Sequence, residues 1–207
     1  MTRLLLVRHG EARGFTDQVV AGHEHCLGLS DLGRRQVGAL AARFERTKEA
    51  SDAAVLYSSI LPRAIETAAI LSPAIGGIDA RQECDLCELH PGEADGMNWE
   101  EFQAKWGIGP WGPDPYARAA PGSETWAEFT ARSAGALHSL AREHEGETVV
   151  VACHGGVIES SLNAFAQLPV QRRFRTDVVN ASVTEWRREG RTWNLVRFND
   201  FAHLSDL

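Results

Sequence analysis

The sequence lacks three things: a long hydrophobic run, a positive net charge and a dense set of cysteines. Its first apolar run, Leu4–Val7, is too short for a signal peptide or a membrane-spanning helix, and no later run reaches the necessary length. A formal net charge of −7 argues against general electrostatic attraction to nucleic acid or to an anionic membrane. Four cysteines in 207 residues are too few for a disulfide framework. We therefore expect a cytoplasmic protein that has neither nucleic acid nor membrane as a partner.

The apolar residues that are present form short runs, and these runs alternate with amphipathic segments. An apolar content of 43% over 207 residues suffices for one sizeable core. Continuous apolar runs are typical of strands covered on both faces, and a 3.6-residue apolar period is typical of helices. We predict strands at Leu4–Val7, Ala53–Tyr57 and Glu147–Cys153, helices after Ser30, at Arg63–Leu71, from Ser123 or Thr125 to about His144 and at Val157–Gln167, and a closing hairpin of Ala181–Arg187 and Trp193–Phe198. Strands that alternate with helices indicate a layered α/β sheet.

Two stretches, residues 12–29 and 84–122, show neither a continuous apolar run nor a 3.6-residue apolar period, and they are predicted to be irregular. The second contains Trp99, Trp106 and Trp111 together with several prolines. An irregular segment of that length inside a compact domain is usually functional or forms a lid. The three tryptophans are either ordinary core or the apolar wall of a pocket, and we favour the wall.

Two histidines, His9 and His154, each follow an apolar strand directly and precede a glycine. Open parallel sheets bind ligands at the carboxyl ends of their strands, so both imidazoles should face the usual place for a site. A lone histidine at a strand end is more often structural, and metal binding is a further alternative. Arg8 argues against a metal beside His9, because a fixed positive charge repels a cation and attracts an anion.

Arg63 and a carboxylate complete the set of candidate residues. Arg63 follows Pro62 in the first turn of a predicted helix, where free N–H groups already favour an anion and a guanidinium matches phosphate oxygens. The alternative is an exposed Arg63 paired with Glu66. Glu88 is the candidate proton donor, although spacing alone does not separate it from Glu83 and Glu93.

Cysteine and histidine also recur at spacings seen in metal sites. Cys84 and Cys87 form a CxxC pair with His90 three residues later, but a second pair is missing from the sequence around it. The segment His23-Glu24-His25-Cys26 reads as a polar loop. We therefore predict two partly buried thiols rather than a metal site.

These motifs together resemble the histidine phosphatase superfamily, also called phosphoglycerate mutase-like. The matching segments, in chain order, are Arg8-His9-Gly10-Glu11, Leu29–Gly33, Ser58–Ala68, Leu86-Cys87-Glu88, Pro121–Glu124, Ala152–Val157, Asn180–Val183 and Asn199–Leu204. The resemblance implies a three-layer α/β/α sandwich with a mostly parallel central sheet. It also implies one domain over residues 1–207 with a small irregular or helical cap inserted at about residues 90–121.

The resemblance assigns a role to each candidate residue. His9 attacks phosphorus and becomes a phosphohistidine, while Arg8, Arg63, His154 and Gly155 hold the phosphoryl oxygens. Glu88 protonates the leaving alkoxide and then deprotonates the water that clears the enzyme. Neither a metal nor another cofactor takes part, and the partner is a small phosphorylated substrate.

The residues after Glu88 favour a phosphoric monoester hydrolase of the histidine phosphatase type over a mutase. Glycolytic mutases have an arginine and a tyrosine where this chain has Leu89 and Pro91, and a lysine where it has Trp99. The alternatives are a phosphoglycerate mutase and a phospho-ligand-binding module without turnover. The sequence leaves the substrate open, and it leaves the oligomeric state open too, with a homodimer as one option.

Overall fold

The computed structural model describes residues 1–207 except 108–111, 113, 172–175 and 206. Within the described part, one sheet has the strand order β3-β2-β4-β1-β5-β6. The strands are β1 Thr2–Arg8, β2 Ala53–Ser58, β3 Ala80–Gln82, β4 Thr148–Cys153, β5 Val183–Glu189 and β6 Thr192–Asp200. The first four strands run parallel, and β5 and β6 pair antiparallel as the closing hairpin. The prediction of a mostly parallel sheet is therefore confirmed.

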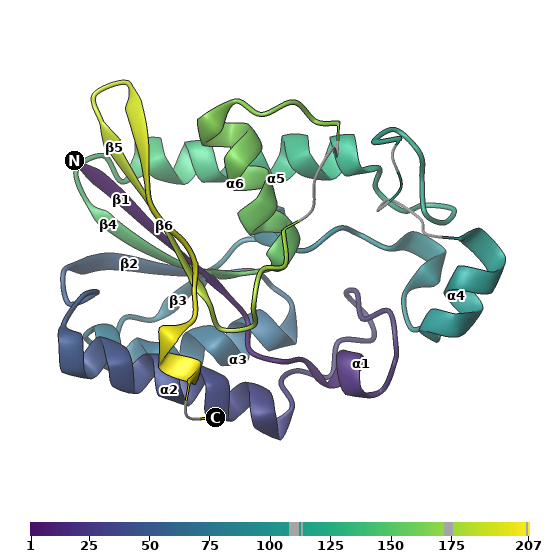
Figure 1. The fold of residues 1–207 in the computed structure, drawn as a ribbon, viewed down its shortest axis with the longest axis horizontal. Helices are drawn as coiled ribbons and strands as arrows, with labels where there is room; N and C mark the ends of the chain where they lie inside the picture. The colour runs from purple at the N-terminus through teal and green to yellow at the C-terminus, as the bar shows by residue number, and fades with distance from the viewer. Residues whose placement is uncertain (108–111, 113, 172–175, 206) are drawn as a thin grey trace.

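Helices cover both faces of this sheet, which gives the expected three layers (Figure 1). The helices α2 (Asp31–Thr47) and α3 (Pro62–Leu71) lie on one face, and α5 (Trp126–Glu143) and α6 (Gly155–Ala166) lie on the other. Burial on both faces of β1 explains why Leu4–Val7 is a continuous apolar run. Leu4 and Leu6 pack into the core under α5 and α6, whereas Leu5 and Val7 pack into the core under α2 and α3.

The helix starts follow capping rules that are visible in the sequence. Ser30 Oγ accepts a hydrogen bond of 3.0 Å from the backbone N–H of Gly33, at the start of α2. Thr125 forms a reciprocal capping box with Glu128 at the start of α5, which selects Thr125 over Ser123 as the cap. Pro62 occupies the first turn of α3, where its missing N–H costs no hydrogen bond.

Three short elements lie where no regular structure was predicted: β3, α1 (Arg13–Thr16) and α4 (Trp99–Trp106). The last is an eight-residue helix whose apolar face, Trp99, Phe102 and Trp106, packs with Val20 in a small separate core. Eight residues are too few for a clear period, so tertiary packing rather than pattern decides this helix. Single turns of 3-10 helix lie at η1 Ser72–Ile75, η2 Cys84–Leu86, η3 Gly92–Ala94 and η5 Ala202–Leu204.

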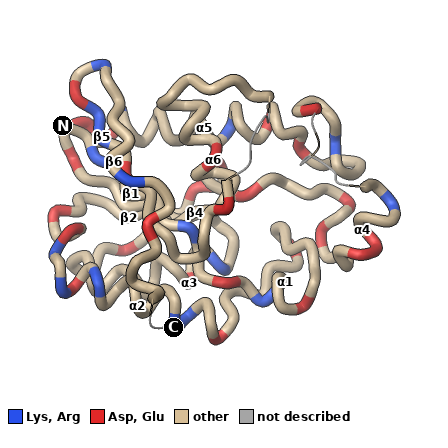
Figure 2. Tube along the Cα trace, in the orientation of Figure 1, with Lys and Arg blue, Asp and Glu red and all other residues tan. Residues whose placement is uncertain are grey.

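The carboxyl ends of β1, β2 and β4 open toward α1 and α4, which lie together beyond the sheet in Figure 1. Figure 2 shows basic and acidic residues interspersed along the described part of the trace. Among the described helices, none is long and apolar enough to cross a membrane.

Candidate active site

Parallel pairing of β1 with β4 brings the two strand-end histidines together. Arg8 lies opposite Cys153 in the register, and the backbone N–H of His9 donates to the Cys153 carbonyl at 2.9 Å. The next residues, His9 and His154, therefore leave the sheet side by side, with ring centroids 5.1 Å apart. Both rings are buried, His9 at 7% exposure and His154 at 0%. The predicted meeting of two histidines far apart in sequence is what the structure shows.

The contacts of the His9 ring decide which nitrogen carries its proton. Nδ1 lies 2.6 Å from the backbone carbonyl of Gly10, and because a carbonyl can only accept, Nδ1 must hold the hydrogen. Nε2 in turn accepts a hydrogen bond of 3.2 Å from Arg63 Nε. His9 thus presents a lone pair at Nε2, the state that a nucleophilic imidazole requires.

Close backbone packing holds the Gly10 carbonyl against the ring. A Cβ atom at Gly10 would lie 2.4 Å from the backbone oxygen of Gly33, in the first turn of α2. Only glycine allows this approach of the loop to the helix, because backbone atoms cannot move aside as a flexible side chain can. Close packing against α2 therefore requires glycine at position 10.

Burial and positive neighbours keep both imidazoles neutral. The pKa of His9 lies well below 6.5, first because the ring is buried and then because Arg63 and Arg8 repel a proton. The pKa of His154 is also lowered well below 6.5, with burial again the first cause and Arg63 the second. At neutral pH the Nε2 lone pair of His9 is consequently available.

Arg63 reaches the site from the first turn of α3 and is itself buried at 6% exposure. Besides its bond to His9, its Nη1 donates to the carbonyl of Ala21 at 2.8 Å and to Cys26 Sγ at 3.3 Å. The alternative pairing with Glu66 is wrong, because Glu66 accepts from Arg34 at 3.1 Å instead. Arg63 is therefore directed inward to the site.

Arg8, at the end of β1, places a second guanidinium beside the histidines. Its Nη1 donates to the backbone carbonyl of Val178, and its Nε is buried without a hydrogen-bond partner among the described residues. Burial lowers the pKa of Arg8, Glu88 raises it, and Arg63 lowers it further. Two cations and one carboxylate therefore act on one another within the site.

The structure separates the three candidate carboxylates. Glu88 Oε2 accepts from the backbone N–H of Gly156 at 3.1 Å, in the first turn of α6 directly after His154. Glu83 instead caps the short turn η2 through Asp85 N at 3.1 Å, and Glu93 is exposed outside the cleft lining. Glu88 is the one that borders Arg8 and His9 in the same cleft.

Ser59 is a site residue that its sequence context did not single out. Its buried Oγ lies 2.8 Å from His154 Nε2 and accepts from the backbone N–H of Leu61 at 3.1 Å. His154 Nδ1 is buried and has no hydrogen-bond partner in the part of the chain that the structure describes. The signal in the sequence was the position of Ser59, directly after strand β2 and just before Pro62. Ser59 orients the ring of His154.

Arg8, His9, Arg63 and Glu88 border a cleft of about 270 Å³ at the strand ends. Away from His9 its wall is mainly apolar, and Trp99 forms part of that wall as predicted. Trp106 is not among the described lining residues, and its ring lies 5.9 Å from that of Phe102. Trp111 lies outside the described residues. The lining residues are Arg8, His9, Ala12, Gly14, Phe15, Val19, Val20, Ala21, Arg63, Glu88, Leu89, Pro91, Ala94, Trp99, Phe102 and Ala119.

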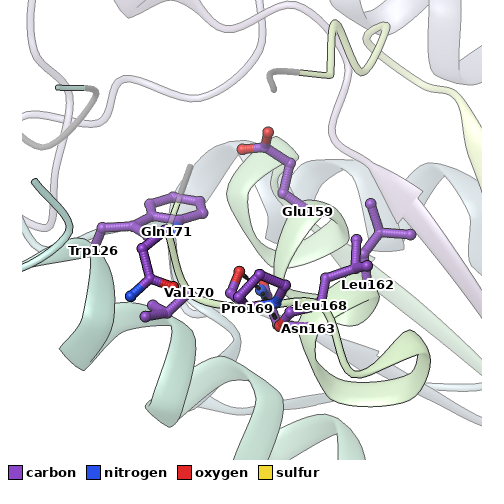
Figure 3. A pocket seen from close by; sticks show the side chains of 8 residues that line it. All are labelled: Trp126, Glu159, Leu162, Asn163, Leu168, Pro169, Val170 and Gln171. Atoms are coloured by element: carbon purple, nitrogen blue, oxygen red, sulfur yellow. Dashed lines mark hydrogen bonds between the residues drawn. The ribbon is translucent and has the colours of Figure 1, made fainter. Parts of the chain in front are cut away.

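A second hollow lies between α5, α6 and the segment that follows α6 (Figure 3). Trp126 and Glu159 border it, and its volume is about 30 Å³. None of the described candidate site residues lines this hollow. The strand-end cleft is the candidate substrate site because Arg8, His9, Arg63 and Glu88 border it.

The CxxC pair lies next to this cleft and acquires a neighbour that the sequence did not indicate. Cys84 Sγ is 3.9 Å from His23 Nε2 and 4.0 Å from Cys87 Sγ, and both thiols are free. Burial, followed by the adjacent Cys87, raises the pKa of Cys84 to about 11. The predicted thiol pair is present, although only Cys84 is partly buried and Cys87 is fully buried, and His23 and His90 lie beside the pair.

Comparisons with known proteins agree with this geometry. The family model described as histidine phosphatase superfamily (branch 1) matches residues 4–201. Phosphoglycerate mutase-like protein 4 and a metal-independent phosphoserine phosphatase, both from Arabidopsis thaliana, are each 29% identical. The matches cover 98% and 100% of this chain and 87% and 85% of those proteins. The solved structure of Bacillus stearothermophilus YhfR is 28% identical, with a TM-score of 0.86 over 98% of this chain and 99% of that one. The chain belongs to the histidine phosphatase superfamily, branch 1.

Proposed function

We propose that this chain hydrolyses small phosphomonoesters through a phosphohistidine formed on His9, with no metal ion in the reaction. The observation that carries the proposal is the state of His9: a neutral ring with its lone pair at Nε2, held 3.2 Å from Arg63 Nε. An imidazole in this state is a competent nucleophile toward phosphorus.

The first step forms the bond from His9 Nε2 to phosphorus and breaks the bond from phosphorus to the ester oxygen. Glu88 gives its proton to that departing oxygen, which leaves as an alcohol. In the second step Glu88 takes a proton from water, and the resulting oxygen attacks phosphorus. The phosphorus–nitrogen bond breaks, and inorganic phosphate and neutral His9 are regenerated.

Phosphoryl transfer depends mainly on positioning and on neutralising charge. Arg8 and Arg63 supply two fixed positive charges, and the buried Nε of Arg8 is one donor for a phosphoryl oxygen. His154 supplies a third contact, because a phosphate dianion beside the ring favours a proton on it. Gly155 begins α6, whose first turn favours an anion. These residues supply the charge that a metal ion would otherwise provide.

The cleft favours hydrolysis over phosphoglycerate mutation. Among the described lining residues, Arg8 and Arg63 are the cations, and both border His9. A mutase needs further cations for the substrate carboxylate, but Leu89, Pro91 and Trp99 lie there instead. We propose a leaving group with an uncharged, partly apolar body, which such a wall binds.

Trapping of the intermediate tests the proposed function. Enzyme mixed with a radiolabelled phosphoester and quenched in base should hold acid-labile label on His9. His9→Ala should lose both label and turnover while it still melts cooperatively. Stoichiometric label on another residue, or turnover by His9→Ala, would refute the assignment.

A panel of phosphoesters, ranked by kcat/KM, tests the leaving group. Aryl and alkyl phosphates should exceed 3-phosphoglycerate and phosphoserine, whose carboxylates meet no extra cation among the described lining residues. Trp99→Ala should reduce the difference in kcat/KM between these two groups of substrates. An unchanged ranking would contradict the role of the apolar wall. The same panel includes 2- and 3-phosphoglycerate, so mutase exchange would be detected directly.

The cytoplasmic location remains a proposal. It is supported by the four free cysteines, because a reducing compartment keeps thiols free.

A further inference from the structure

Four side chains that can bind a metal converge beside the strand-end cleft, and the reaction above uses none of them. His23 comes from the loop after α1, and Cys84, Cys87 and His90 come from the segment after β3. One potential ligand atom from each lies within 4.8 Å of every other. Residues 61 positions apart in sequence thus meet in one Cys₂His₂ cluster.

The separations between the potential ligand atoms are slightly longer than those of a tetrahedral zinc site. With zinc–sulfur bonds of about 2.3 Å and zinc–nitrogen bonds of about 2.0 Å, ligand atoms lie about 3.3–3.8 Å apart. Here the two sulfurs are 4.0 Å apart, and Cys84 Sγ is 3.9 Å from His23 Nε2. The rings of His23 and His90 approach edge to face, with centroids at 4.5 Å. Closure around zinc needs movements of about 1.5 Å or less.

The surroundings of the His90 ring provide a second, independent observation. Its Nε2 is buried and has no hydrogen-bond partner within the described chain. Its Nδ1 lies 3.9 Å from the Glu124 carboxylate, which Arg132 holds in place at 2.7 Å. Zinc-binding histidines characteristically direct their other ring nitrogen at a carboxylate, which fixes the ring and its tautomer. A ligand at Nε2 would satisfy the atom that is otherwise orphaned.

We propose that His23, Cys84, Cys87 and His90 bind a structural zinc ion. Two thiolates with two imidazoles form a closed tetrahedral set, which leaves no open position for substrate or water. The ion therefore stabilises the fold and takes no part in phosphoryl transfer. The sequence alone disfavoured a metal because the fourth ligand, His23, is distant along the chain.

The location of the site indicates what zinc would hold in place. Glu88 lies between Cys87 and His90, so two ligands flank the proposed proton donor. His23 follows Ala21, whose carbonyl accepts from Arg63. The ion would thus join the two segments that carry Glu88 and the Arg63 contact.

Cobalt substitution provides the direct test. Purified chain, reduced and stripped of metal, should bind one equivalent of Co²⁺ with the visible bands of a tetrahedral ion and thiolate-to-cobalt charge transfer. Zn²⁺ should displace it and raise the melting temperature. Protein purified without chelator should contain one zinc per chain.

Variants of one loop give a matched comparison. His23→Gln and Cys84→Ser should weaken cobalt binding at least tenfold and abolish the zinc-dependent rise in melting temperature. His25 lies two residues from His23 and pairs with Asp95. His25→Gln should therefore keep the cobalt affinity and the zinc-dependent rise in melting temperature of the parent chain. His23 is exposed, so its variant should fold, and a melting curve without metal checks this.

Three results would overturn the proposal. These are an octahedral cobalt spectrum without charge transfer, equal cobalt affinity in His23→Gln and the parent chain, or a Cys84–Cys87 disulfide in protein isolated free of metal. None of these readouts depends on turnover, so the proposed function can fail or hold independently.

Discussion

Substitution of Gly156 changes the position of the Glu88 carboxyl group without changing the group itself. Its backbone N–H donates to Glu88 Oε2 at 3.1 Å, and a Cβ atom there would lie 2.3 Å from Glu88 Oε1. The same Cβ would lie 2.9 Å from Cζ of Phe129, which is fully buried. In Gly156→Ala the Glu88 carboxylate must therefore move, whereas the His9 side of the site is untouched.

The expected magnitudes follow from these contacts. Alanine in place of glycine in a helix gains about 1 kcal/mol, and overpacking against Phe129 costs about 1–3 kcal/mol. We expect a net destabilisation of about 0–2 kcal/mol. General acid catalysis contributes about 10²–10⁴-fold, so loss of its geometry should lower kcat for an alkyl phosphate by about 10²-fold. Nitrophenyl phosphate should lose less than about tenfold, because nitrophenolate leaves without a proton.

The assay compares the two substrates in Gly156→Ala, Glu88→Gln and the double variant. If Gly156 acts through Glu88, the double variant should lose little more activity than Glu88→Gln alone. Gly135→Ala, in α5, controls for helix propensity and should leave activity unchanged, because a Cβ atom at Gly135 would meet no neighbouring group within 4 Å. Equal losses for both substrates, or fully additive effects in the double variant, would refute the reasoning.

Three further predictions concern the rest of the site. The folded pKa values of His9 and His154 lie below 6.5, so the unfolded chain binds more protons and stability should fall as pH drops below about 6.5, by up to about 1.4 kcal/mol per pH unit for each ring. Urea unfolding at pH 7.5 and 5.5 measures this, and His9→Gln should reduce the slope. Ser59→Ala leaves His154 Nε2 buried and unpaired and should cost about 1–3 kcal/mol in urea unfolding, so a neutral result would contradict the ring-orienting role. Arg63→Lys keeps the charge but loses the planar fork that joins His9 to the Ala21 carbonyl, and kcat should fall at least tenfold; near-normal turnover would show that charge alone suffices.

Local signals in the sequence were sufficient for most of the fold. The apolar run Leu4–Val7 predicts a strand because both its faces are buried, and β1 confirms it. Ser30 marks a helix start through a hydrogen bond to a neighbouring residue, and Pro62 marks one because its missing N–H costs no bond in the first turn. The apolar pattern did not predict helix α4, because its short apolar face is stabilised by Val20 and Ala94 from other segments, although the family resemblance allowed a helical cap.

Part of the candidate site was also predictable from the sequence, and part was not. Position at a strand end made Arg8, His9 and His154 candidates, since the carboxyl ends of parallel strands meet at one edge. Arg63 was a candidate from its place in the first turn of a helix. Spacing alone left the carboxylate open, the family resemblance named Glu88, and the structure places Glu88 against Gly156 at the start of α6.

Sequence alone determined which chemical groups the chain carries and where its strands end. Tertiary structure alone decided the proton position on His9, through a carbonyl held by packing against α2, and the meeting of His23 with the CxxC pair. The physical reason is range: strand and helix signals act over a few residues, whereas a hydrogen bond or a metal site depends on atoms that only folding brings within a few ångströms.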